Sequence, residues 1–356
     1  LLVQTVNSDY ILPPQNIFHR PHITAACAYP APSASATLDN TMPISPGQTP
    51  TMTAATANVI TAYSGKTWRR LRRALLRGSS DGSCRVEKLP DGILRYTPQL
   101  PREDIDSILH AEANKLPQAD IKVDHKRIIT RVWLRDKSYV LKTYRHLYRW
   151  LAVSPDCKGW LGAHQLDNGV ACYAWFRKND LSSATIIYAD AGNRDLYISK
   201  QHQCSDDRAY SLYHQAGAII AALHRQNIFH ADTKPGNFVY MDDSAVASRV
   251  YLIDTDDVRS YWRLSVRRRI KNLAQFIGLT REDVPINIYV TAFTALLKGY
   301  MEHYPVAPAA FLALLPAIDD AMTTLYPERQ SRNQAILKLL AERLQPESSD
   351  TSIHPS

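Results

Sequence analysis

The sequence predicts an α+β fold of two lobes, a small β-rich lobe followed by a mainly helical one. Short runs rich in β-branched and aromatic residues, with partial alternation, lie between residues 85 and 188. Longer runs with the 3.6-residue apolar period of helices lie between residues 189 and 345. A third observation is a polar motif within residues 223–257, where charged and polar groups stand at the spacings that one particular chemistry requires.

The strands of the small lobe are predicted from five runs. The alternation favours strands over residues 92–97, 127–134 and 138–144, followed by residues 170–176 and 184–188. Residues 135–137 are expected to be the turn of a hairpin, which places Lys142 inside the hairpin's second strand between apolar neighbours.

The helices of the large lobe are predicted from apolar stripes. Residues 206–226 carry a stripe of Leu212, Ala216, Ile219 and Leu223, as a buried helix does. Further helices are expected over residues 286–303, 309–325 and 330–345.

The remaining parts of the chain differ in composition. The first 60 residues are rich in Ala, Thr, Pro and Ser with very few charges, which predicts disorder or a non-native extension. Residues 61–84 are expected to form a basic amphipathic helix and a linker, and residues 346–356 a disordered tail.

Composition places the chain among soluble or peripheral proteins. Of the 356 residues 45% are apolar, and no apolar run approaches the ~18 residues that a membrane span needs. Five cysteines show no C-x-x-C pair and no metal-ligand spacing, which favours reduced thiols in a cytoplasmic setting and implies no zinc site.

The formal net charge of +8 is concentrated in two clusters. Residues 66–77 and residues 259–271 each hold six basic groups and no acid. Such clusters attract phosphate-bearing or anionic partners, although a merely solvated basic face has the same composition. Nucleic acid is the less favoured partner, because the chain has no zinc finger, RNA-recognition motif or aromatic residues interleaved with the basic ones.

The first basic cluster has a helical pattern with two interpretations. One face of the helix predicted over residues 66–77 is apolar and the other is rich in arginine; the apolar residues are Trp68, Leu71, Leu75 and Leu76. Such a helix can lie in an anionic membrane interface, which is the slightly favoured interpretation. It can also be the first helix of the domain, packed on the small lobe.

The polar motif contains the residues with the clearest chemistry. His230, Asp232, Lys234 and Asn237 form H-x-D-x-K-P-x-N, and Asp254 follows the next apolar run. The motif looks like the catalytic loop and the metal-binding strand end of a protein-kinase-like phosphotransferase.

Each residue of the motif suits one part of phosphoryl transfer. Asp232 can orient an attacking hydroxyl and take its proton, and Lys234 can reach the transferred phosphate as a point charge. Mg²⁺ prefers oxygen ligands and takes few from the protein, so Asn237 and Asp254 suffice for it. Residues 237–241 and 249–253 read as a hairpin with a turn at residues 242–244, which would bring these two ligands to one end.

The neighbouring acids and histidine have open roles. Asp256 and Asp257 either bind a second metal or are solvated loop acids, while His230 is expected to support the loop rather than act as a base. Basic groups from Arg259 onward suggest an acidic or phosphorylated acceptor.

A strand lysine such as Lys142 is like the kinase lysine that holds the ATP α- and β-phosphates. Two usual companions are missing, because residues 111–141 contain no glycine and no glutamate occurs between Glu112 and Glu282. Asp156, at the start of a helix-like segment, is then the best-placed carboxylate to orient Lys142, although an aspartate there is equally suited to capping the helix. Adenine is expected to bond to the backbone near residues 188–190, at the hinge between the lobes.

Four runs of sequence resemble one family: Y-V-L-K-T-Y-R, F-H-A-D-T-K-P-G-N-F, Y-L-I-D-T-D-D-V-R and R-R-R-I-K-N-L-A-Q-F. They are similar to the bacterial lipopolysaccharide core kinases, the Kdo/heptose kinase family that includes WaaP- and InaA-like proteins. The resemblance covers roughly residues 90–300 and is most specific in residues 229–273. The family usually has Glu-Trp in the helix after the lysine, where this chain has Gly159-Trp160.

The resemblance implies a protein-kinase-like fold, ATP with Mg²⁺, and phosphorylation of an inner-core sugar at the cytoplasmic face of the inner membrane. By the same match Asp232 takes the position of the catalytic base, Asn237 and Asp254 the metal positions, and Lys142 that of the ATP lysine. The acceptor would be a glycolipid of the lipopolysaccharide core, held near an anionic membrane surface.

Three alternatives remain open from the sequence. The same chemistry could act on a protein or a small molecule, because the acceptor is chosen by loops. The chain could be a pseudokinase that binds nucleotide without turnover, as the missing glycines and glutamate suggest. A basic nucleic-acid-binding protein is the least favoured alternative and predicts strongly salt-dependent binding.

Overall fold

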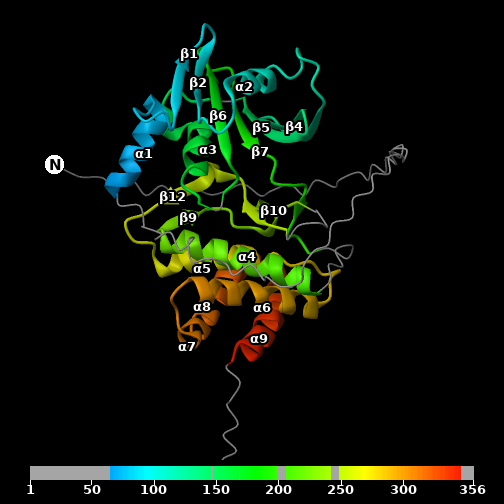
Figure 1. Ribbon diagram of the computed structural model, residues 1–356. Helices are drawn as coiled ribbons and strands as arrows, with labels where there is room; N and C mark the ends of the chain where they lie inside the picture. Colours follow the sequence, from blue (N-terminus) through cyan, green and yellow to red (C-terminus); the bar gives the residue numbers. More distant parts are fainter. Residues whose placement is uncertain (1–64, 146, 168, 199–205, 242–247, 346–356) are drawn as a thin grey trace, which may run out of the picture. The chain divides into compact units, whose positions relative to one another are not determined.

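The computed structural model describes residues 65–345, except residues 146, 168, 199–205 and 242–247. All described residues lie within one compact unit, Val59–Ser356 (Figure 1). The predictions for residues 1–60 and 346–356 therefore lie outside the described residues, as do parts of the predicted linker and the hairpin turn.

The small lobe is built on one antiparallel sheet. Its seven strands lie in the order β1-β2-β6-β7-β5-β4-β3. Their bounds are β1 Arg85–Lys88, β2 Gly92–Tyr96, β3 Gln118–Val123, β4 Arg127–Leu134, β5 Lys137–Tyr144, β6 Cys172–Lys178 and β7 Ala184–Ala189. All five predicted strands are present, whereas β1 and β3 were not predicted. Each residue of the edge strand β3 is exposed, so its sequence lacks the alternation that marks a half-buried strand.

Helices cover both faces of this sheet. On one face α2 (Arg102–Leu109) packs Ile105 and Ile108 against a cluster that contains Leu94. On the other face α3 (Pro155–Ala163) packs Trp160 against Trp175. The small lobe thus has an apolar cluster on each side of its sheet.

The basic helix α1 (Gly65–Arg77) joins the second of these clusters. Leu75 is 2% exposed, and Trp68 and Leu71 are partly buried against the same residues. The indole nitrogen of Trp160 also donates to the carbonyl of Leu75 at 3.1 Å. The favoured interpretation, in which this apolar face enters a membrane, is therefore wrong, because the face packs on the small lobe.

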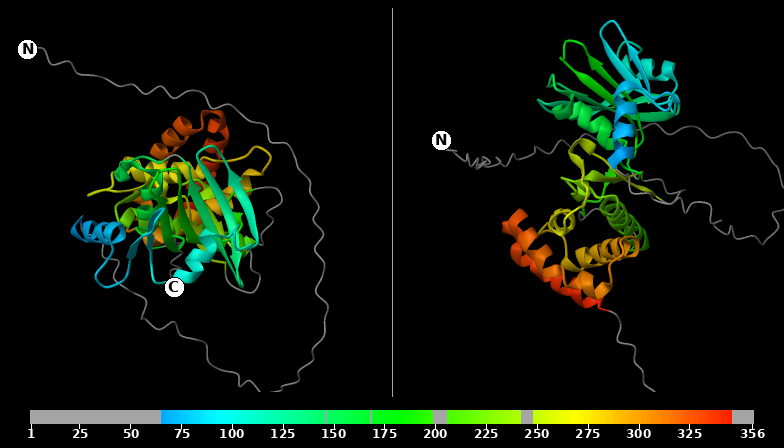
Figure 2. Two further views of the ribbon diagram at one scale, coloured as in Figure 1. Left: turned by 90° about the horizontal axis from the view of Figure 1, so that it is seen from above. Right: turned by 90° about the vertical axis from the view of Figure 1, so that its left-hand side faces the viewer.

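The large lobe is mainly helical and has its own core. Its helices are α4 Asp206–Arg225, α5 Val266–Ile277, α6 Ile286–His303, α7 Pro308–Leu312, α8 Leu315–Leu325 and α9 Gln330–Leu344. Helices α4 and α6 lie side by side, and Phe276, Phe293 and Leu296 lie in the cluster that they share with α5 (Figures 1 and 2). The predicted two-lobed α+β fold is confirmed.

The helix predicted over residues 309–325 is two helices. Helix α7 ends at Leu312 and α8 begins at Leu315, with a proline at its start. By length and composition, Pro308–Leu325 is a candidate membrane span with a mean hydropathy of 1.2, the one candidate among the described residues. In the structure Phe311, Ile318 and Met322 of this stretch are fully buried in the core of the large lobe.

Short strands between the lobes position the polar motif. Strand β10 (Phe238–Tyr240) pairs with β11 (Val250–Leu252) on one side and with β8 (Arg194–Asp195) on the other. Strand β9 (Ile228–His230) pairs with β12 (Val258–Ser260). The predicted hairpin of β10 and β11 is therefore present.

Candidate active site

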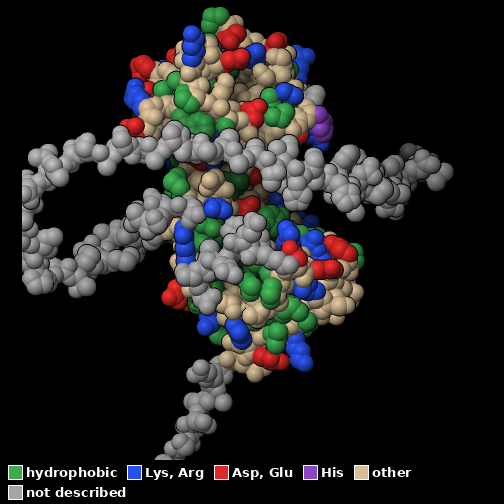
Figure 3. Space-filling model, turned by 90° about the vertical axis from the view of Figure 1, so that its right-hand side faces the viewer, with side chains coloured by type: hydrophobic (Ala, Val, Ile, Leu, Met, Phe, Trp, Pro, Cys, Tyr) green, Lys and Arg blue, Asp and Glu red, His purple; other side chains and the backbone are tan. Residues whose placement is uncertain are grey.

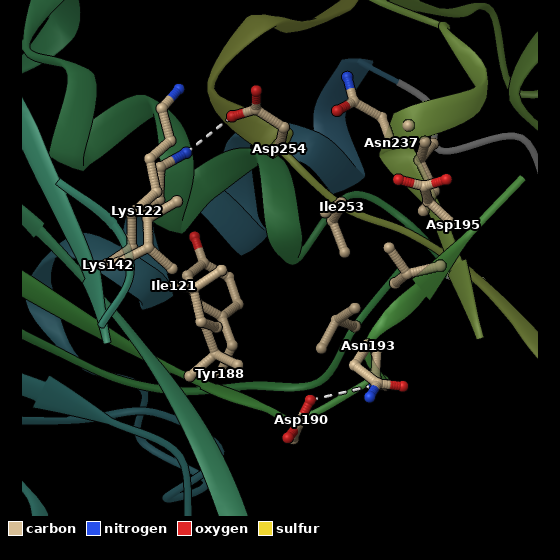
Figure 4. Close-up of a pocket in the computed structure, with 18 of the residues that line it drawn as sticks. Ile121, Lys122, Lys142, Tyr188, Asp190, Asn193, Asp195, Asn237, Ile253 and Asp254 are labelled. Carbon is tan, nitrogen blue, oxygen red and sulfur yellow. Dashed lines mark hydrogen bonds and ion pairs between the residues drawn. The ribbon is translucent and has the colours of Figure 1, made fainter. Parts of the chain in front are cut away.

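A pocket of about 410 Å³ lies between the two lobes. Its walls come from β3, β4 and β5 of the small lobe, the segment after β7, and the ends of β10 and β11 (Figure 4). Ile121, Val140 and Tyr188 give the pocket apolar walls, whereas Lys142 and Asp254 give it a charged end. A volume in the usual range for small-molecule sites and this division between apolar and charged ends fit a nucleotide.

The hairpin brings Asn237 and Asp254 to the same end, as predicted. The backbone nitrogen of Ile253 donates to the carbonyl of Asn237 at 2.9 Å, directly before Asp254. Asp254 has a left-handed backbone conformation with φ of 62°, which ends the strand and turns its side chain toward Lys142 (Figure 4).

The loop between β9 and β10 holds Asp232, Lys234 and Asn237 together. The Lys234 ammonium lies 2.5 Å from Asp232 Oδ2, and the Asn237 amide nitrogen donates to the carbonyl of Asp232 at 2.7 Å. The side chains of Asp232 and Lys234 are each 39% exposed, so both can reach a ligand. In Figure 4 the amide oxygen of Asn237 lies on the side of Asp254.

The buried side chain of His230 supports this loop. The ring is fully buried, and its Nδ1 accepts a hydrogen bond from the backbone nitrogen of Asp232 at 3.2 Å. Burial lowers the pKa of His230 despite the nearby Asp254 and Asp232 carboxylates, so the ring is held neutral. This geometry agrees with the expectation that His230 props the loop.

Helix α5 anchors the loop, which the sequence analysis missed. Asn272 donates to the carbonyl of His230 at 2.6 Å, and Gln275 donates to the carbonyl of Ala231 at 2.6 Å. Thr233 donates in turn to the carbonyl of Asn272 at 2.9 Å. The available signal was a pair of amide side chains among the apolar residues of R-R-R-I-K-N-L-A-Q-F, because buried amides need partners.

Lys142 of β5 faces two aspartates of the large lobe. Its side chain is 7% exposed, and its ammonium lies 2.7 Å from Asp254 Oδ1. The same ammonium lies 2.9 and 2.8 Å from the two carboxylate oxygens of Asp256. One strand lysine thus joins the small lobe to two acids that follow β11.

The charge of Asp254 is fixed by these neighbours. Burial by itself would raise the pKa of Asp254, but the Lys142 ammonium and the Arg127 guanidinium outweigh that effect. The pKa therefore lies well below its ordinary value of 3.8, and the carboxylate is ionised at neutral pH.

The structure does not bring Asp156 to Lys142, so Asp156 is not its carboxylate partner. Asp156 is fully buried, and its Oδ2 lies 2.7 Å from Nη1 of Arg177 on β6. It also accepts hydrogen bonds from Ser154 and from the indole nitrogen of Trp175. Nor does it cap the helix, since the N-cap residue of α3 is Ser154. Its partners instead fasten α3 to the sheet.

Asp256 is a carboxylate partner of Lys142, and its carboxylate lies beside Gly159, where the family usually has a glutamate. A Cβ atom on Gly159 would stand 2.8 Å from Asp256 Oδ1 and 2.6 Å from the hydroxyl of Tyr144. That hydroxyl donates to Asp256 at 2.7 Å. The glycine of α3 therefore gives room to a carboxylate from the other lobe. The sequence identified Asp256 only as a second metal ligand or a solvated acid.

The hairpin of β3 and β4 carries basic side chains in place of a glycine-rich loop. The turn between β3 and β4 is formed by Asp124, which accepts from the backbone nitrogens of Lys126 and Arg127 at 2.8 Å each. Arg127 then reaches Asp254 at 3.2 Å, and Lys122 lines the same pocket. Cations on this hairpin can therefore meet phosphates by charge, where backbone amides of a glycine loop would otherwise do so.

The oxygen groups at this end of the pocket suit a hard cation. Within the described part of the chain no group of three or more His, Cys, Asp or Glu side chains could hold a metal ion. Asn237 and the ionised Asp254 offer one amide oxygen and one carboxylate, a small set of the kind that Mg²⁺ takes when phosphates and water supply the rest. These two residues therefore fit Mg²⁺ and would not fit a closed structural metal site.

In protein-kinase-like phosphotransferases a strand lysine of the small lobe meets a hairpin-end aspartate of the large lobe across the nucleotide pocket. This chain has that arrangement. Residues 177–300 match the family model of the lipopolysaccharide kinase (Kdo/WaaP) family. The match confirms the resemblance drawn from the sequence and identifies the enzyme class as a kinase. It includes Asp232, Asn237 and Asp254 but not Lys142.

Comparison with individual proteins gives more distant similarities. No curated protein matches the chain. A solved structure of WaaP in complex with acyl carrier protein is similar with a TM-score of 0.43 and 14% identity, over 69% of this chain and 99% of that one. The autoinhibited serine kinase domain of the giant muscle protein titin is similar with a TM-score of 0.38 and 16% identity, over 65% and 81%.

Proposed function

We propose that the protein phosphorylates a sugar hydroxyl, of Kdo or heptose, in the inner core of lipopolysaccharide, with ATP as the donor. The observation that carries this proposal is the family match over residues 177–300, which contains the loop of Asp232 and the hairpin end of Asp254. The family supplies the acceptor class, and the pocket supplies the place for the nucleotide.

Asp232 acts on the acceptor. Its carboxylate is partly exposed and is held in place through Asn237 and the buried His230. It orients the sugar hydroxyl for in-line attack on the γ-phosphate and accepts its proton. Lys234, beside it, places a positive charge where the transferred phosphoryl group carries negative charge.

The nucleotide lies with its base in the apolar part of the pocket and its phosphates at the charged end. The backbone of residues 188–191 borders the apolar part, and Ile121 and Val140 face it from the small lobe. Lys142, Lys122 and Arg127 hold the phosphates by charge. Asn237 and Asp254 would hold Mg²⁺, which supplies neutralisation of the phosphate oxygens.

Asp256 positions Lys142 for this task. When Asp254 turns to a cation, the ammonium keeps both oxygens of Asp256 as partners, at 2.9 and 2.8 Å. This contact performs the role that a helix glutamate has in protein kinases. The pseudokinase alternative rested in part on the missing glutamate, so a carboxylate partner from another element weakens it.

The setting that we propose is the cytoplasmic face of the inner membrane, with the enzyme bound peripherally. The acceptor glycolipid is anchored there, so its sugars lie at an anionic surface. Nucleic acid has no place in this proposal.

A transfer assay tests the proposal. Purified protein, γ-labelled ATP and Mg²⁺ are incubated with delipidated core glycolipid from a kinase-deficient strain, beside Asp232→Asn and the matched control Asp257→Asn. Asp257 is exposed and outside the pocket. We expect label on the sugar, a loss of about 10²–10⁴-fold in rate for Asp232→Asn, and little change for the control.

Two results would count against the proposal. Label transferred to a protein or a small molecule but not to the glycolipid would move the acceptor to the alternative class. ATP binding without transfer to any acceptor would favour the pseudokinase.

A further inference from the structure

We propose that the protein docks on an anionic phospholipid bilayer through one face of the compact unit Val59–Ser356. Three segments form this basic face: helix α1, residues 147–153 before α3, and residues 258–271, which run from β12 into α5. None of the three contains an acidic residue. The docking does not depend on the phosphotransfer proposed above.

The charge of this face is entirely positive. Its exposed basic residues include Arg70, Arg72, Arg73, Arg77, Arg149, Arg259, Arg263, Arg267 and Lys271. An acid next to it, Asp257, lies 3.8 Å from Arg259. On the opposite side of the unit, basic and acidic side chains are intermingled (Figure 3). The basic face is therefore a one-sided field, which attracts an extended anionic surface.

Large apolar side chains project from the same face. Trp262 is 97% exposed and Trp150 is 79% exposed, and Tyr148 beside it is 57% exposed. Folding buries none of these rings to a useful extent, although each would gain by leaving water. Tryptophan and tyrosine prefer the interface of a bilayer, where the ring meets the acyl boundary and the polar atom meets the headgroups.

The three segments are neighbours in the fold. Leu147 and Leu151 pack in the same apolar cluster as Trp68 and Leu71 of α1, so the loop before α3 adjoins that helix. Figures 1 and 2 both place α1 and the segment around β12 on the same side of the described residues. In the sequence each tryptophan is next to an arginine, Trp150 to Arg149 and Trp262 to Arg263.

The pairing of aromatic and basic residues favours a bilayer over other anionic partners. A nucleic acid or an acidic protein would be met by charge, which gives no reason for indoles to project from two separate segments. A membrane uses both properties, because headgroups bind the arginines while the interface takes the rings. The apolar face of α1 is not part of this contact, since it is buried on the small lobe.

The basic face includes residues that lie close to the catalytic loop. Strand β12 pairs with β9, and Val258 lies opposite His230, two residues before Asp232. A bilayer held against residues 258–263 would thus lie near the catalytic loop. An acceptor anchored in that bilayer would be presented to Asp232 without leaving the membrane, a consequence that rests on the proposed function.

Vesicle co-sedimentation of the full chain tests the proposal. Vesicles of phosphatidylcholine with phosphatidylglycerol are compared with vesicles of phosphatidylcholine alone, at low and high salt. We expect binding to the anionic vesicles only, weakened by salt because the charges are exposed. The double variant Trp150→Ala, Trp262→Ala should bind about tenfold more weakly, and Arg263→Gln, Arg267→Gln, which removes two of the exposed basic groups of this face, should bind more weakly with a shallower salt dependence.

A matched control uses residues outside the face. Trp133 is 37% exposed on β4 and Arg135 is exposed at the turn after it, so Trp133→Ala, Arg135→Gln removes one tryptophan and one arginine elsewhere. This variant should bind anionic vesicles as the unchanged chain does. Phosphorylation of a delipidated, soluble acceptor should be unchanged in Trp150→Ala, Trp262→Ala, which separates the docking from the transfer reaction.

Three results would overturn the inference. Equal sedimentation with neutral vesicles would mean that charge does not select the surface. Unchanged binding of the tryptophan variant would mean that the indoles do not enter the interface. Absence of vesicle binding, together with tight binding of a small acidic protein or of RNA, would assign the face to that partner instead.

Discussion

Two ion pairs on either side of α3 use the same residue types in opposite ways. On the sheet side, Asp156 and Arg177 are 0% and 6% exposed, and the carboxylate has further partners in Ser154 and Trp175. On the pocket side, Lys142 faces Asp254 and Asp256, which are 25% and 16% exposed. The first pair is closed, whereas the second opens onto a cavity.

The difference teaches which acid serves the fold and which serves a ligand. The ion pair and the hydrogen bonds of Asp156 are all made with protein groups, so its buried carboxylate is not available to a substrate. Lys142 has three carboxylate oxygens within 2.9 Å, and they belong to two aspartates. One ammonium neutralises one carboxylate, so one aspartate can be exchanged for a cation or a phosphate. Three substitutions, from the largest expected effect to the smallest, sharpen this comparison.

Breaking the closed pair should cost the most stability. Asp156→Ala leaves the Arg177 guanidinium buried without its carboxylate, and removal of one partner of a buried pair costs about 3–5 kcal/mol. The measurement is the free energy of unfolding from urea denaturation, which should fall by that amount. Nucleotide affinity per folded molecule should change little.

The contrast with the pocket provides the control. Asp254→Ala removes a partner of Lys142 but leaves Asp256 in place, so its loss of unfolding free energy should be much smaller. If Asp156→Ala unfolds at the same urea concentration as the unchanged protein, the closed pair is not what holds α3 on the sheet.

Removing Asp256 should instead weaken catalysis. A hydrogen bond to a charged group contributes about 1.5–3 kcal/mol, so Asp256→Ala should lower kcat/KM for ATP by roughly 10- to 100-fold. Steady-state kinetics with varied ATP measures this, and Asp256→Glu should recover part of the loss. Asp257→Ala is the matched control, and an equal effect of both variants would contradict the positioning role.

Helices and strands with a regular apolar period could be predicted from the sequence, because that period depends only on residues close together in the chain. The strand predicted over residues 127–134 and the helix over residues 286–303 have the bounds of β4 and α6, since their periodicity is regular. Two β-rich runs over residues 237–241 and 249–253 with turn residues between them were likewise enough to predict the hairpin, and the motif that contains Asp232 was enough to predict the loop.

What the sequence missed depends on contacts between distant elements. Asp256 is 114 positions from Lys142, and only the packed structure shows that Gly159 leaves space for it. The hypothesis that Asp156 orients Lys142 failed for the same reason, because the partner of Asp156 is Arg177 on β6. Strand β3 was missed because its exposure removes the pattern, and the break before α8 because apolar residues continue through it.

The smallest effect on stability is expected from His224, a buried neutral side chain of the large lobe. It contrasts with the charged groups of the pocket. His224 accepts from the hydroxyl of Tyr300 at Nδ1, 2.9 Å away, and donates to Asn272 from Nε2 at 3.1 Å. Burial lowers the pKa of His224 from 6.5 to about 3. Between these values the unfolded chain binds a proton that the folded chain does not, so stability falls as the pH falls.

The prediction is a difference in slope. The free energy of unfolding should fall with decreasing pH from about 6.5, by up to about 1.4 kcal/mol per pH unit from His224 alone. His224→Gln, which cannot take up this proton, should show a slope shallower by that amount. Thr280→Val removes a buried hydrogen bond to Asn333 without removing a titrating group, so it should lower the whole curve without changing its slope. Parallel curves for His224→Gln and the unchanged protein would mean that the imidazole becomes protonated inside the fold, and that the large lobe accommodates buried charge as readily as the pocket does.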